Sequence, residues 1–295
     1  MKSYPLVSII VVNYNTSGEV LEMLASLDQS TYPNYEVILV DNASPKDDLS
    51  LIEEKYPSVQ LIKSSKNLGF AGANNLGIDV AKGTYCLFLN PDTCVTPLFL
   101  EPLVETLVQN SNIGLVSPKI KYYDTPDLIQ YAGTSRMSKY TMRSNSFSKK
   151  KEDNPENSTA RLTGYGHGAA MMLPKAVIDK VGKMNESYFL YYEEIDWCER
   201  IHYQGYEVYY QANSVIFHKE SASIQKESPL KIFYLSRNRI LFAKIHYKMA
   251  QFIFYCFYTL FILVPKHVVK YIRQPKLLKA YLKGILSHFS SSITI

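Results

Sequence analysis

Three short polar segments hold the residues best able to do chemistry. Each follows an apolar run: NYN at 13–15 follows VSIIVV, Asp41 follows YEVILV, and NPD at 90–92 follows YCLFL. In a parallel α/β sheet, ligands bind beyond the carboxyl ends of the strands. Asp41 could accept a hydrogen bond from a nucleotide base, and Asp92 could hold Mg²⁺ or Mn²⁺ on a diphosphate. The alternative for each segment is a turn residue that satisfies its own backbone.

A second group of acidic residues lies in the segment FLYYEEIDWCER. Glu193 and Glu194 fall at or before the first turn of an expected helix, where the helix dipole favours carboxylates. Asp196 lies four residues before Arg200, so these two side chains can pair on one helix face. The segment is either an ordinary charged helix start or the source of a general base at the mouth of a cleft.

Two further features have both a structural and a functional interpretation. The segment NLGFAGANNLGI starts at Asn67, and its glycines, such as Gly69, allow backbone to approach a ligand closely. Asn residues such as Asn74 can cap a helix that we expect over 74–82. The segment is neither a Walker loop nor a G-x-G-x-x-G motif. His218 follows the apolar run VIF and is either a structural histidine or a further ligand of an ion on Asp92.

The elements that must position these residues alternate between strands and helices. We expect strands at 7–12, 35–40, 59–63 and 85–89, and helices at 19–27, 48–55, 74–82 and 97–109. This alternation predicts an α/β fold with a mostly parallel sheet. Further on we expect a polar surface loop over 139–161, helices at 174–181 and 191–203, and short strands at 207–210 and 214–217.

Composition narrows the classes of protein that remain. The chain has 295 residues, and 46% of them are apolar, which is enough for a sizeable core. Four cysteines without a C-x-x-C pair favour a reducing compartment over a disulfide framework or a zinc cluster. No signal peptide precedes the first strand, so we expect a cytoplasmic protein.

Charge is distributed unevenly along the chain. Residues 219–295 hold 13 Lys/Arg and 2 Asp/Glu, whereas the first 218 residues hold 19 basic and 25 acidic side chains. A basic tail can bind nucleic acid or an anionic membrane surface. Because this tail is also rich in Phe, Tyr, Ile and Leu, we expect a membrane partner and no nucleic acid.

Residues 249–265 form an uncharged run of 17 residues with lysines on both sides. As a helix the run would be about 26 Å long, slightly less than the ~30 Å hydrocarbon core of a bilayer. Three interpretations remain: a helix lying in the membrane interface, a true membrane span, or a helix buried against the rest of the chain or in a homodimer contact.

Taken together, these segments resemble the family 2 glycosyltransferases, inverting enzymes with a GT-A type fold. The resemblance is greatest to the rhamnosyltransferase-like branch of bacterial cell-surface polysaccharide synthesis. It covers residues 6 to about 223, and the combination of NLGFAGANN, LNPD and YYEEIDWCER is highly specific. The other matching segments are VSIIVVNYN, VILVDNAS, GHGAAMMLPKAVIDKVGKMNESYF, RIHYQGY and VIFHKESAS.

The resemblance implies a role for each matching position. Asp92 and His218 would hold Mg²⁺ or Mn²⁺, and Glu194 would be the catalytic base. The residues expected to line a dTDP- or UDP-linked sugar donor are Asn13, Tyr14, Asn15, Asp41, Asn67, Gly69, Asn74 and Asn90. The acceptor would be a glycan or a polyprenyl-linked oligosaccharide. It also implies a catalytic domain at 1–225, with a nucleotide half at 1–113 and an acceptor half at 114–225, followed by a helical membrane-associating region at 226–295.

The chain departs from the family pattern at two positions. Asn90 stands where the metal motif usually begins with Asp, and Glu194 stands where the base is usually Asp. The extra methylene of Glu194 shifts its carboxylate, so Glu193 or Asp196 remain alternative bases. These departures also leave open a non-catalytic sugar-nucleotide-binding or scaffold protein. A nucleotidyltransferase is disfavoured because residues 13–18 carry no basic side chain.

Overall fold

A computed structural model describes residues 4–147, 151–220 and 227–288 of the chain. Its first half is a parallel sheet in the order β3-β2-β1-β4. The strands are β1 (Val7–Asn13), β2 (Tyr35–Asp41), β3 (Gln60–Lys63) and β4 (Tyr85–Leu89). In this register Asn13 lies opposite Asp41, so their side chains meet at the carboxyl edge.

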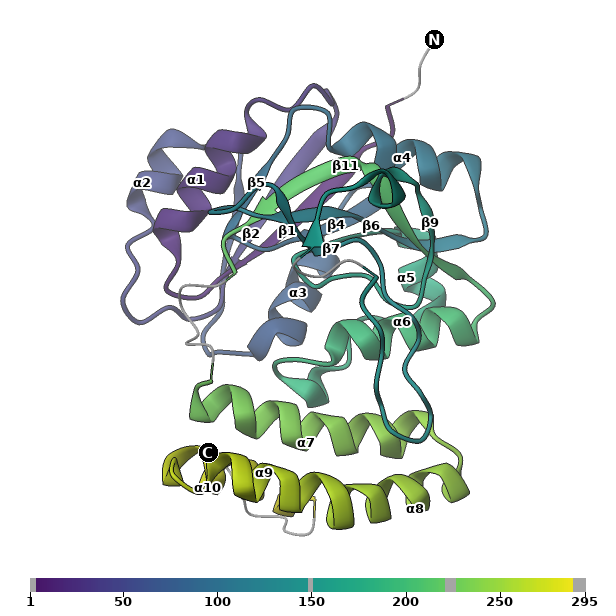
Figure 1. Cartoon of the computed structure of the whole chain (residues 1–295). Helices are drawn as coiled ribbons and strands as arrows, with labels where there is room; N and C mark the ends of the chain where they lie inside the picture. The colour runs from purple at the N-terminus through teal and green to yellow at the C-terminus, as the bar shows by residue number, and fades with distance from the viewer. Residues whose placement is uncertain (1–3, 148–150, 221–226, 289–295) are drawn as a thin grey trace.

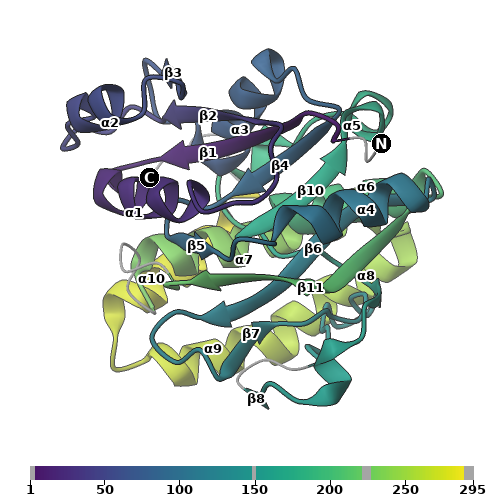
Figure 2. The same ribbon diagram turned by 90° about the horizontal axis from the view of Figure 1, so that it is seen from above.

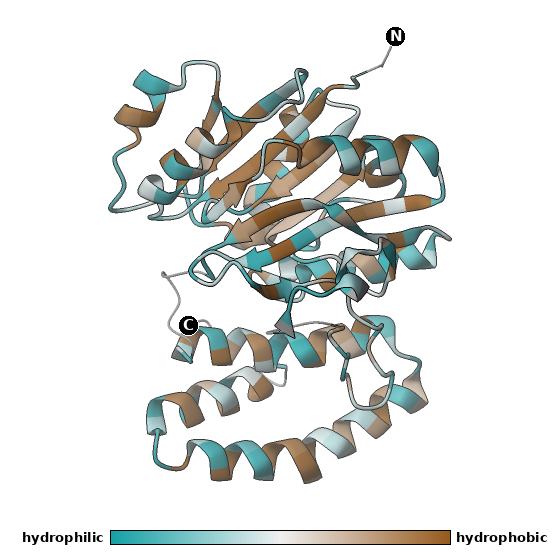
Figure 3. Cartoon of the chain, turned by 45° about the horizontal axis from the view of Figure 1, so that its top comes forward, coloured by the Kyte–Doolittle hydropathy of each residue, from teal (hydrophilic) through white to brown (hydrophobic). Residues whose placement is uncertain are grey.

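Helices cover both faces of this sheet (Figure 2), which explains why its strands are apolar throughout rather than alternating. One face packs against α1 (Ser17–Leu27), α2 (Ser50–Lys55) and α4 (Leu100–Gln109). The other face packs against α3 (Gly69–Val80), α5 (Lys175–Val181) and α6 (Glu193–Tyr203). Figure 3 shows the strands between these helices as largely hydrophobic.

The second half of the sheet is mixed in direction. Strand β10 (Ala170–Pro174) runs antiparallel to β4 and to β6 (Ile113–Tyr122), and β11 (Glu207–His218) then runs parallel to β6. Strand β5 (Thr93–Val95) pairs antiparallel with the end of β11. Three strands extend the sheet beyond this path: β7 (Leu128–Tyr131), β8 (Lys151–Glu152) and β9 (Arg161–Thr163).

Three sequence predictions need correction. The helix expected over 74–82 starts at Gly69, because its small residues pack closely instead of forming a loop. The two short strands expected at 207–210 and 214–217 are the single strand β11, with a register shift between Gln211 and Val215. The expected loop over 139–161 also contains β8 and the 3₁₀ turn η1 (Pro155–Ser158).

The C-terminal chain adds a layer of helices below the sheet (Figure 1). Helix α7 (Pro229–His246) lies next to the sheet-bearing part, and α8 (Met249–Tyr258), α9 (Val264–Tyr271) and α10 (Pro275–Leu286) lie beneath it. A π-helical segment, η3 (Thr259–Leu263), joins α8 to α9. Asn238 and His246 of α7 bond to the chain around α6, so the layer is tied to the sheet-bearing part.

Gly69 is needed where α3 meets the chain before α6. Its φ is +71°, and a Cβ at this position would lie 2.2 Å from the carbonyl oxygen of Phe189. We expect Gly69→Ala to destabilise the fold by about 2 kcal/mol or more, because strain and overlap act together. Gly18→Ala is the matched control, since a Cβ there meets nothing within 4 Å in a helix that favours Ala. Urea unfolding measures both; equal midpoints for the two variants would contradict this account.

Candidate active site

The carboxyl edge of β1 and β2 is held together by Asn13. Its buried amide nitrogen lies 3.0 Å from Asp41 Oδ1, 3.1 Å from Ser44 Oγ and 3.0 Å from Asp47 Oδ2. Its oxygen accepts hydrogen bonds from the N–H and hydroxyl of Thr16. Asn13 therefore shapes this edge from within, since its polar atoms are already used by the protein.

The neighbouring residues present more accessible groups at the same edge. Tyr14 is 43% exposed, and Asn15 has a positive φ of 57°. The Asn15 side-chain oxygen accepts from the Lys46 N–H. Asp41 is partly exposed while one of its oxygens accepts from Asn13. The edge thus presents an aromatic ring and a carboxylate that is already oriented.

The start of α3 is tied to this edge by a buried Asn42. The Asn42 amide nitrogen donates to Asn67 Oδ1 at 3.0 Å and to the Gly69 carbonyl at 3.1 Å, and its oxygen accepts from the Leu68 N–H. Asn74 lies inside the helix and donates to the Phe70 carbonyl. These contacts fix the 67–74 segment beside the carboxyl edge. The polar side chains of Asn67 and Asn74 form hydrogen bonds within the protein.

Asp92 and His218 come together because of the β5–β11 register. His218 pairs with Thr93, which brings its ring next to the preceding residue. His218 Nε2 lies 3.1 Å from Asp92 Oδ1, and both side chains are buried. His218 Nδ1 lies 2.8 Å from Gln130 Oε1, an acceptor, so Nδ1 carries the hydrogen. Two residues 126 positions apart in sequence thus form one pair.

This pair suits a divalent cation. With Nδ1 donating to Gln130, neutral His218 has a lone pair on Nε2 that faces the Asp92 carboxylate. Nε2 is buried and makes no hydrogen bond, so a cation between the two groups would satisfy both. Among the described residues, no group of three or more His, Cys, Asp and Glu side chains is placed to hold a metal. The remaining ligands would then come from diphosphate oxygens and water, as is common for Mg²⁺.

A cleft of about 550 Å³ extends from His218 of this pair toward α6. Asn90 and His218 line one part, and Glu193 and Glu194 line another. The loop 166–169 also lines the cleft and connects the two parts. Its Ala169 carbonyl accepts from the Asn90 N–H at 2.9 Å, and Glu194 lies over Gly168, about 4 Å from where a Cβ would be. Glu194 and His218, the partner of Asp92, therefore line the same cleft.

The three carboxylates in the first turn of α6 lie in different environments. Burial, followed by the charge of Glu194, raises the pKa of Glu193 well above its usual range, and Glu193 Oε2 makes no hydrogen bond. Burial also raises the pKa of Glu194. Asp196 is fully buried, yet hydrogen bonds from His246 and Arg200 hold its pKa below the usual value. A raised pKa makes a carboxylate a stronger base, which favours the two glutamates.

Asp196 has a structural role. Its oxygens accept from His246 Nε2 at 2.7 Å, Arg200 Nε at 2.8 Å and the Tyr188 hydroxyl at 3.2 Å. The predicted pairing of Asp196 with Arg200 is thus confirmed. Because its contacts hold α6 to α7, Asp196 is poorly placed to accept a proton from a substrate.

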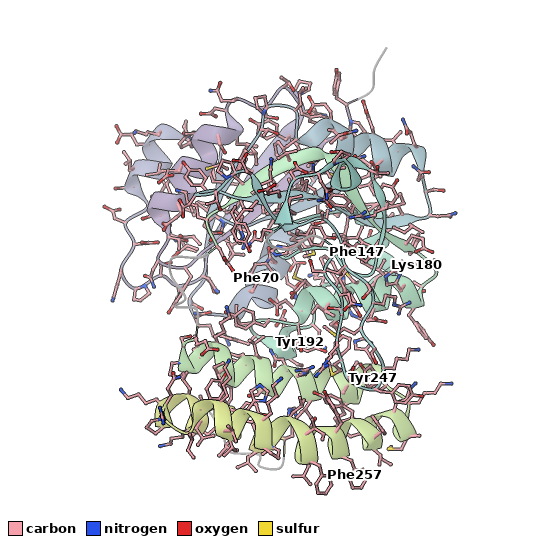
Figure 4. All side chains as sticks on the ribbon, in the orientation of Figure 1. Phe70, Phe147, Lys180, Tyr192, Tyr247 and Phe257 are labelled. Atoms are coloured by element: carbon pink, nitrogen blue, oxygen red, sulfur yellow. The ribbon has the colours of Figure 1, made fainter. Side chains whose placement is uncertain are left out.

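The backbone before Glu193 is strained. Phe189, Tyr191 and Tyr192 have φ values of 64°, 68° and 78°, a conformation that costs non-glycine residues about 1–3 kcal/mol each. Asn238 of α7 is fully buried, and its amide nitrogen lies 2.8–2.9 Å from the carbonyl oxygens of Tyr188, Leu190 and Tyr191. In Figure 4, Tyr192 lies between α6 and α7. Helix α7, through Asn238, thus holds the turn that presents both glutamates.

Sequence reasoning missed three of the residues that build this site. Gln130 orients His218, Asn42 fixes the start of α3, and Asn238 holds the strained turn. None carries a charge, and only Asn42 lies in one of the matching segments, VILVDNAS. Only the positions of their partners, 25 to 88 residues away in sequence, reveal their roles.

Solved structures share this fold. The crystal structure of GalNAc-T7 with UDP, GalNAc and Mn²⁺ matches with a TM-score of 0.61 at 16% identity, over 79% of this chain and 49% of that one. The mannosyltransferase PcManGT from Pyrobaculum calidifontis, in complex with GDP-Man and Mn²⁺, matches with a TM-score of 0.60 at 16% identity, over 100% of this chain and 77% of that one. The fold is therefore the GT-A type, and the predicted fold class is confirmed.

Sequence comparisons identify the family. The model of glycosyl transferase family 2 matches residues 8–182, and the chain belongs to that family. A low-salt glycan biosynthesis hexosyltransferase, Agl10, of Haloferax volcanii is 24% identical over 79% of this chain and 74% of its own length. An N-acetylglucosaminyl-diphospho-decaprenol L-rhamnosyltransferase of Mycobacterium tuberculosis is 24% identical over 72% of this chain and 75% of its own.

A third relative matches more strongly over a shorter stretch. An uncharacterized glycosyltransferase of Haemophilus influenzae is 38% identical over 112 residues, which are 38% of this chain and 37% of that protein. The matched part is thus little more than a third of that relative's length. Together the comparisons confirm the resemblance to a rhamnosyltransferase-like branch and show a glycosyltransferase.

The opposite environments on α6 predict opposite effects on stability. Ionised Glu193 is disfavoured in the fold, so Glu193→Gln should stabilise the protein above pH ~4.3, the usual Glu pKa, with the gain levelling off above the raised pKa. Glu199 is the matched control, because hydrogen bonds from Arg136 and Tyr165 hold its pKa below the usual value despite burial. Glu199→Gln should therefore destabilise at neutral pH. Unfolding at pH 4 and pH 8 tests both; shifts of the same sign at pH 8 would contradict the assignment.

Proposed function

We propose that the chain is an inverting glycosyltransferase of cell-surface polysaccharide synthesis. It would transfer a sugar from a dTDP- or UDP-linked donor to a hydroxyl of a glycan or a lipid-linked oligosaccharide. The observation that carries this proposal is the single cleft lined by both Glu194 and His218, the residue that pairs with Asp92. The compounds named with GalNAc-T7 and PcManGT, a nucleotide or nucleotide sugar with Mn²⁺, support a donor site of this kind.

The cleft residues divide the reaction between them. Glu194 takes the proton of the acceptor hydroxyl as that oxygen attacks the anomeric carbon from the face opposite the leaving group. The bond from the anomeric carbon to the diphosphate breaks, and a nucleoside diphosphate leaves. A divalent cation held by Asp92 and His218 would supply positive charge at the diphosphate. One displacement inverts the anomeric configuration and needs no covalent intermediate.

Glu194 is the best of the three candidate bases. It is half-buried in the cleft beside Gly168, and burial raises its pKa. Glu193 also lines the cleft but is only 4% exposed, and Asp196 is committed to three other side chains. Tyr14, Asn15 and Asp41 remain our proposal for the nucleotide side, with Asn13, Asn67, Gly69, Asn74 and Asn90 shaping that wall.

We also propose that the protein is cytoplasmic and binds the inner face of the cell membrane through its C-terminal layer. One helix, Met249–Tyr271, is long and apolar enough to cross a membrane by length and composition, which is weak evidence for a span. Its inner side is buried through Tyr255, Thr259, Leu263 and Tyr271. Its outer side exposes apolar side chains, and Figure 4 shows Phe257 pointing away from α7. This arrangement suits a helix lying in the interface.

Asp92→Ala should abolish metal-dependent donor binding and transfer while the fold survives. The mutation removes the carboxylate that lies 3.1 Å from His218 Nε2. Calorimetric titration with nucleotide sugars, with and without Mn²⁺, measures the loss. Asp79→Ala, an exposed carboxylate on α3 that pairs with Lys183, is the control and should bind as the wild type does. Undiminished Mn²⁺-dependent binding by Asp92→Ala would show that the cation lies elsewhere.

Glu194→Gln should keep donor binding but lower turnover by about 10²-fold or more, because a general base is lost. Activity of the wild type should fall as the pH drops through the raised pKa of Glu194, since the protonated carboxyl cannot accept a proton. Product formation under donor saturation measures both effects. If Glu193→Gln causes the large loss of turnover and Glu194→Gln changes turnover little, the base is Glu193.

The membrane proposal predicts salt-sensitive binding to anionic liposomes, because each basic residue near such a surface contributes on the order of 1 kcal/mol. Replacing Phe257 and Phe261 of the outer side by Glu should abolish flotation with these liposomes. The control replaces Leu98 and Val108, which are equally exposed but lie on the sheet-bearing part. Resistance to salt and carbonate extraction would indicate a span instead. If the protein does not bind anionic liposomes, the membrane proposal is wrong, and the outer side would belong to a protein contact such as a homodimer.

A further inference from the structure

A second cavity, of about 360 Å³, lies within the C-terminal helical layer. Its volume falls within the ~300–1,000 Å³ typical of small-ligand sites. Four basic side chains line it: Lys231 and Arg239 from α7, and His267 and Lys270 from α9. One acidic side chain, Glu227, also lines it and pairs with Lys270. The lining is therefore cationic, which is unusual for the inside of a helical layer.

Two residues that line the cavity each have a buried polar atom without a hydrogen bond. These atoms are Arg239 Nε and Thr259 Oγ1, and Thr259 is only 7% exposed. The other end of the Arg239 guanidinium is held by the carbonyls of Thr141 and Met142. Buried donors without partners are rare in native proteins. Both are donors, so the acceptor oxygens of an anion would satisfy them.

The rest of the cavity wall is apolar. Ile232, Leu235, Leu263 and Ile285 line it, together with the rings of Tyr255, Tyr271 and Tyr281. Branched aliphatic and aromatic side chains of this kind suit a hydrocarbon ligand. The same cavity can thus take an anionic head and an apolar chain.

This cavity adjoins the proposed active-site cleft. Lys231 and Leu235 line both spaces. Tyr191 lines the cleft, and the next residue, Tyr192, lines the cavity. Lys231 and Leu235 are four residues apart on α7 and therefore share one helix face. The cavity also lies behind α8–α9, whose opposite side carries the exposed Phe257. A ligand drawn from a membrane at that side would approach the catalytic cleft past Lys231.

We propose that this cavity binds the phosphate and the first isoprene units of a polyprenyl-phosphate-linked acceptor, with Lys231 and Arg239 at the phosphate. The inference rests on the proposed function, because it supplies the acceptor site for the same reaction. The sugar end of the acceptor then extends into the cleft toward Glu194. The wall shared at Lys231 and Leu235 is where the head of the lipid passes from one space to the other.

Geranyl phosphate, a short soluble prenyl phosphate, is the probe. Calorimetric titration of the full chain should show saturable binding without donor or metal, and tighter binding than geraniol or inorganic phosphate. Lys231→Ala should weaken it about 10-fold, as expected for losing a charge-assisted hydrogen bond. Lys279→Ala is the matched control, because it removes one basic charge from the same layer but lies outside the cavity. It should change affinity less than about twofold.

Lys231→Arg tests the charge directly and should restore most of the affinity. The proposal is overturned if geranyl phosphate does not bind saturably, if geraniol binds equally well, or if Lys231→Ala and Lys279→Ala lose affinity alike. Nucleotide-sugar binding by the same preparation separates this from the proposed function. Geranyl phosphate binding without any nucleotide-sugar binding would leave the cavity assignment standing while the glycosyltransferase proposal fails. Donor binding without geranyl phosphate binding would overturn the cavity assignment and leave the glycosyltransferase proposal standing.

Discussion

The rest of the site depends on the hydrogen bonds between Asn238 and the turn before α6. The backbone carbonyls of Tyr188, Leu190 and Tyr191 converge on the buried Asn238 amide, and residues of this turn adopt positive φ values that would relax without it. The same turn offers the Phe189 carbonyl to the Phe70 N–H, which fixes the first turn of α3. A residue of the C-terminal layer thus sets both the position of the first turn of α3 and the direction in which Glu193 and Glu194 enter the cleft.

Environment gives neighbouring carboxylates different roles. Asp196 is ionised within a network of His246, Arg200 and Tyr188 that ties α6 to α7. Glu193 is buried and Glu194 is half-buried, neither with such partners, so their pKa values rise and the fold is less stable when they ionise. Separating titratable groups in this way is how one site can hold both a structural anion and a base. The C-terminal layer is tied to the cleft through α7, because this one helix carries Asn238, His246 and Lys231.

The sequence was informative where the signal was local. Apolar runs followed by Asn or Asp located β1, β2 and β4 and brought Asn13 next to Asp41, because parallel strands end at one edge. The i,i+4 spacing located the pair of Asp196 and Arg200. Long-range features could not be predicted: the antiparallel insertion of β10, the Gln130 partner of His218 and the Asn238 clamp all depend on tertiary contacts. The glycines of α3 were misleading because close packing outweighed their low helix propensity.

The central claim is that Asp92 and His218 hold a cation at the end of the cleft that faces Glu194. Crystals grown with Mn²⁺ and a nucleoside diphosphate, measured at the manganese absorption edge, test it most directly. The account predicts one anomalous peak bonded to Asp92 and to His218 Nε2 and touching the diphosphate, with Gln130 still on Nδ1. A diphosphate bound in the cleft with manganese on other residues, or with His218 turned away from Asp92, would contradict it.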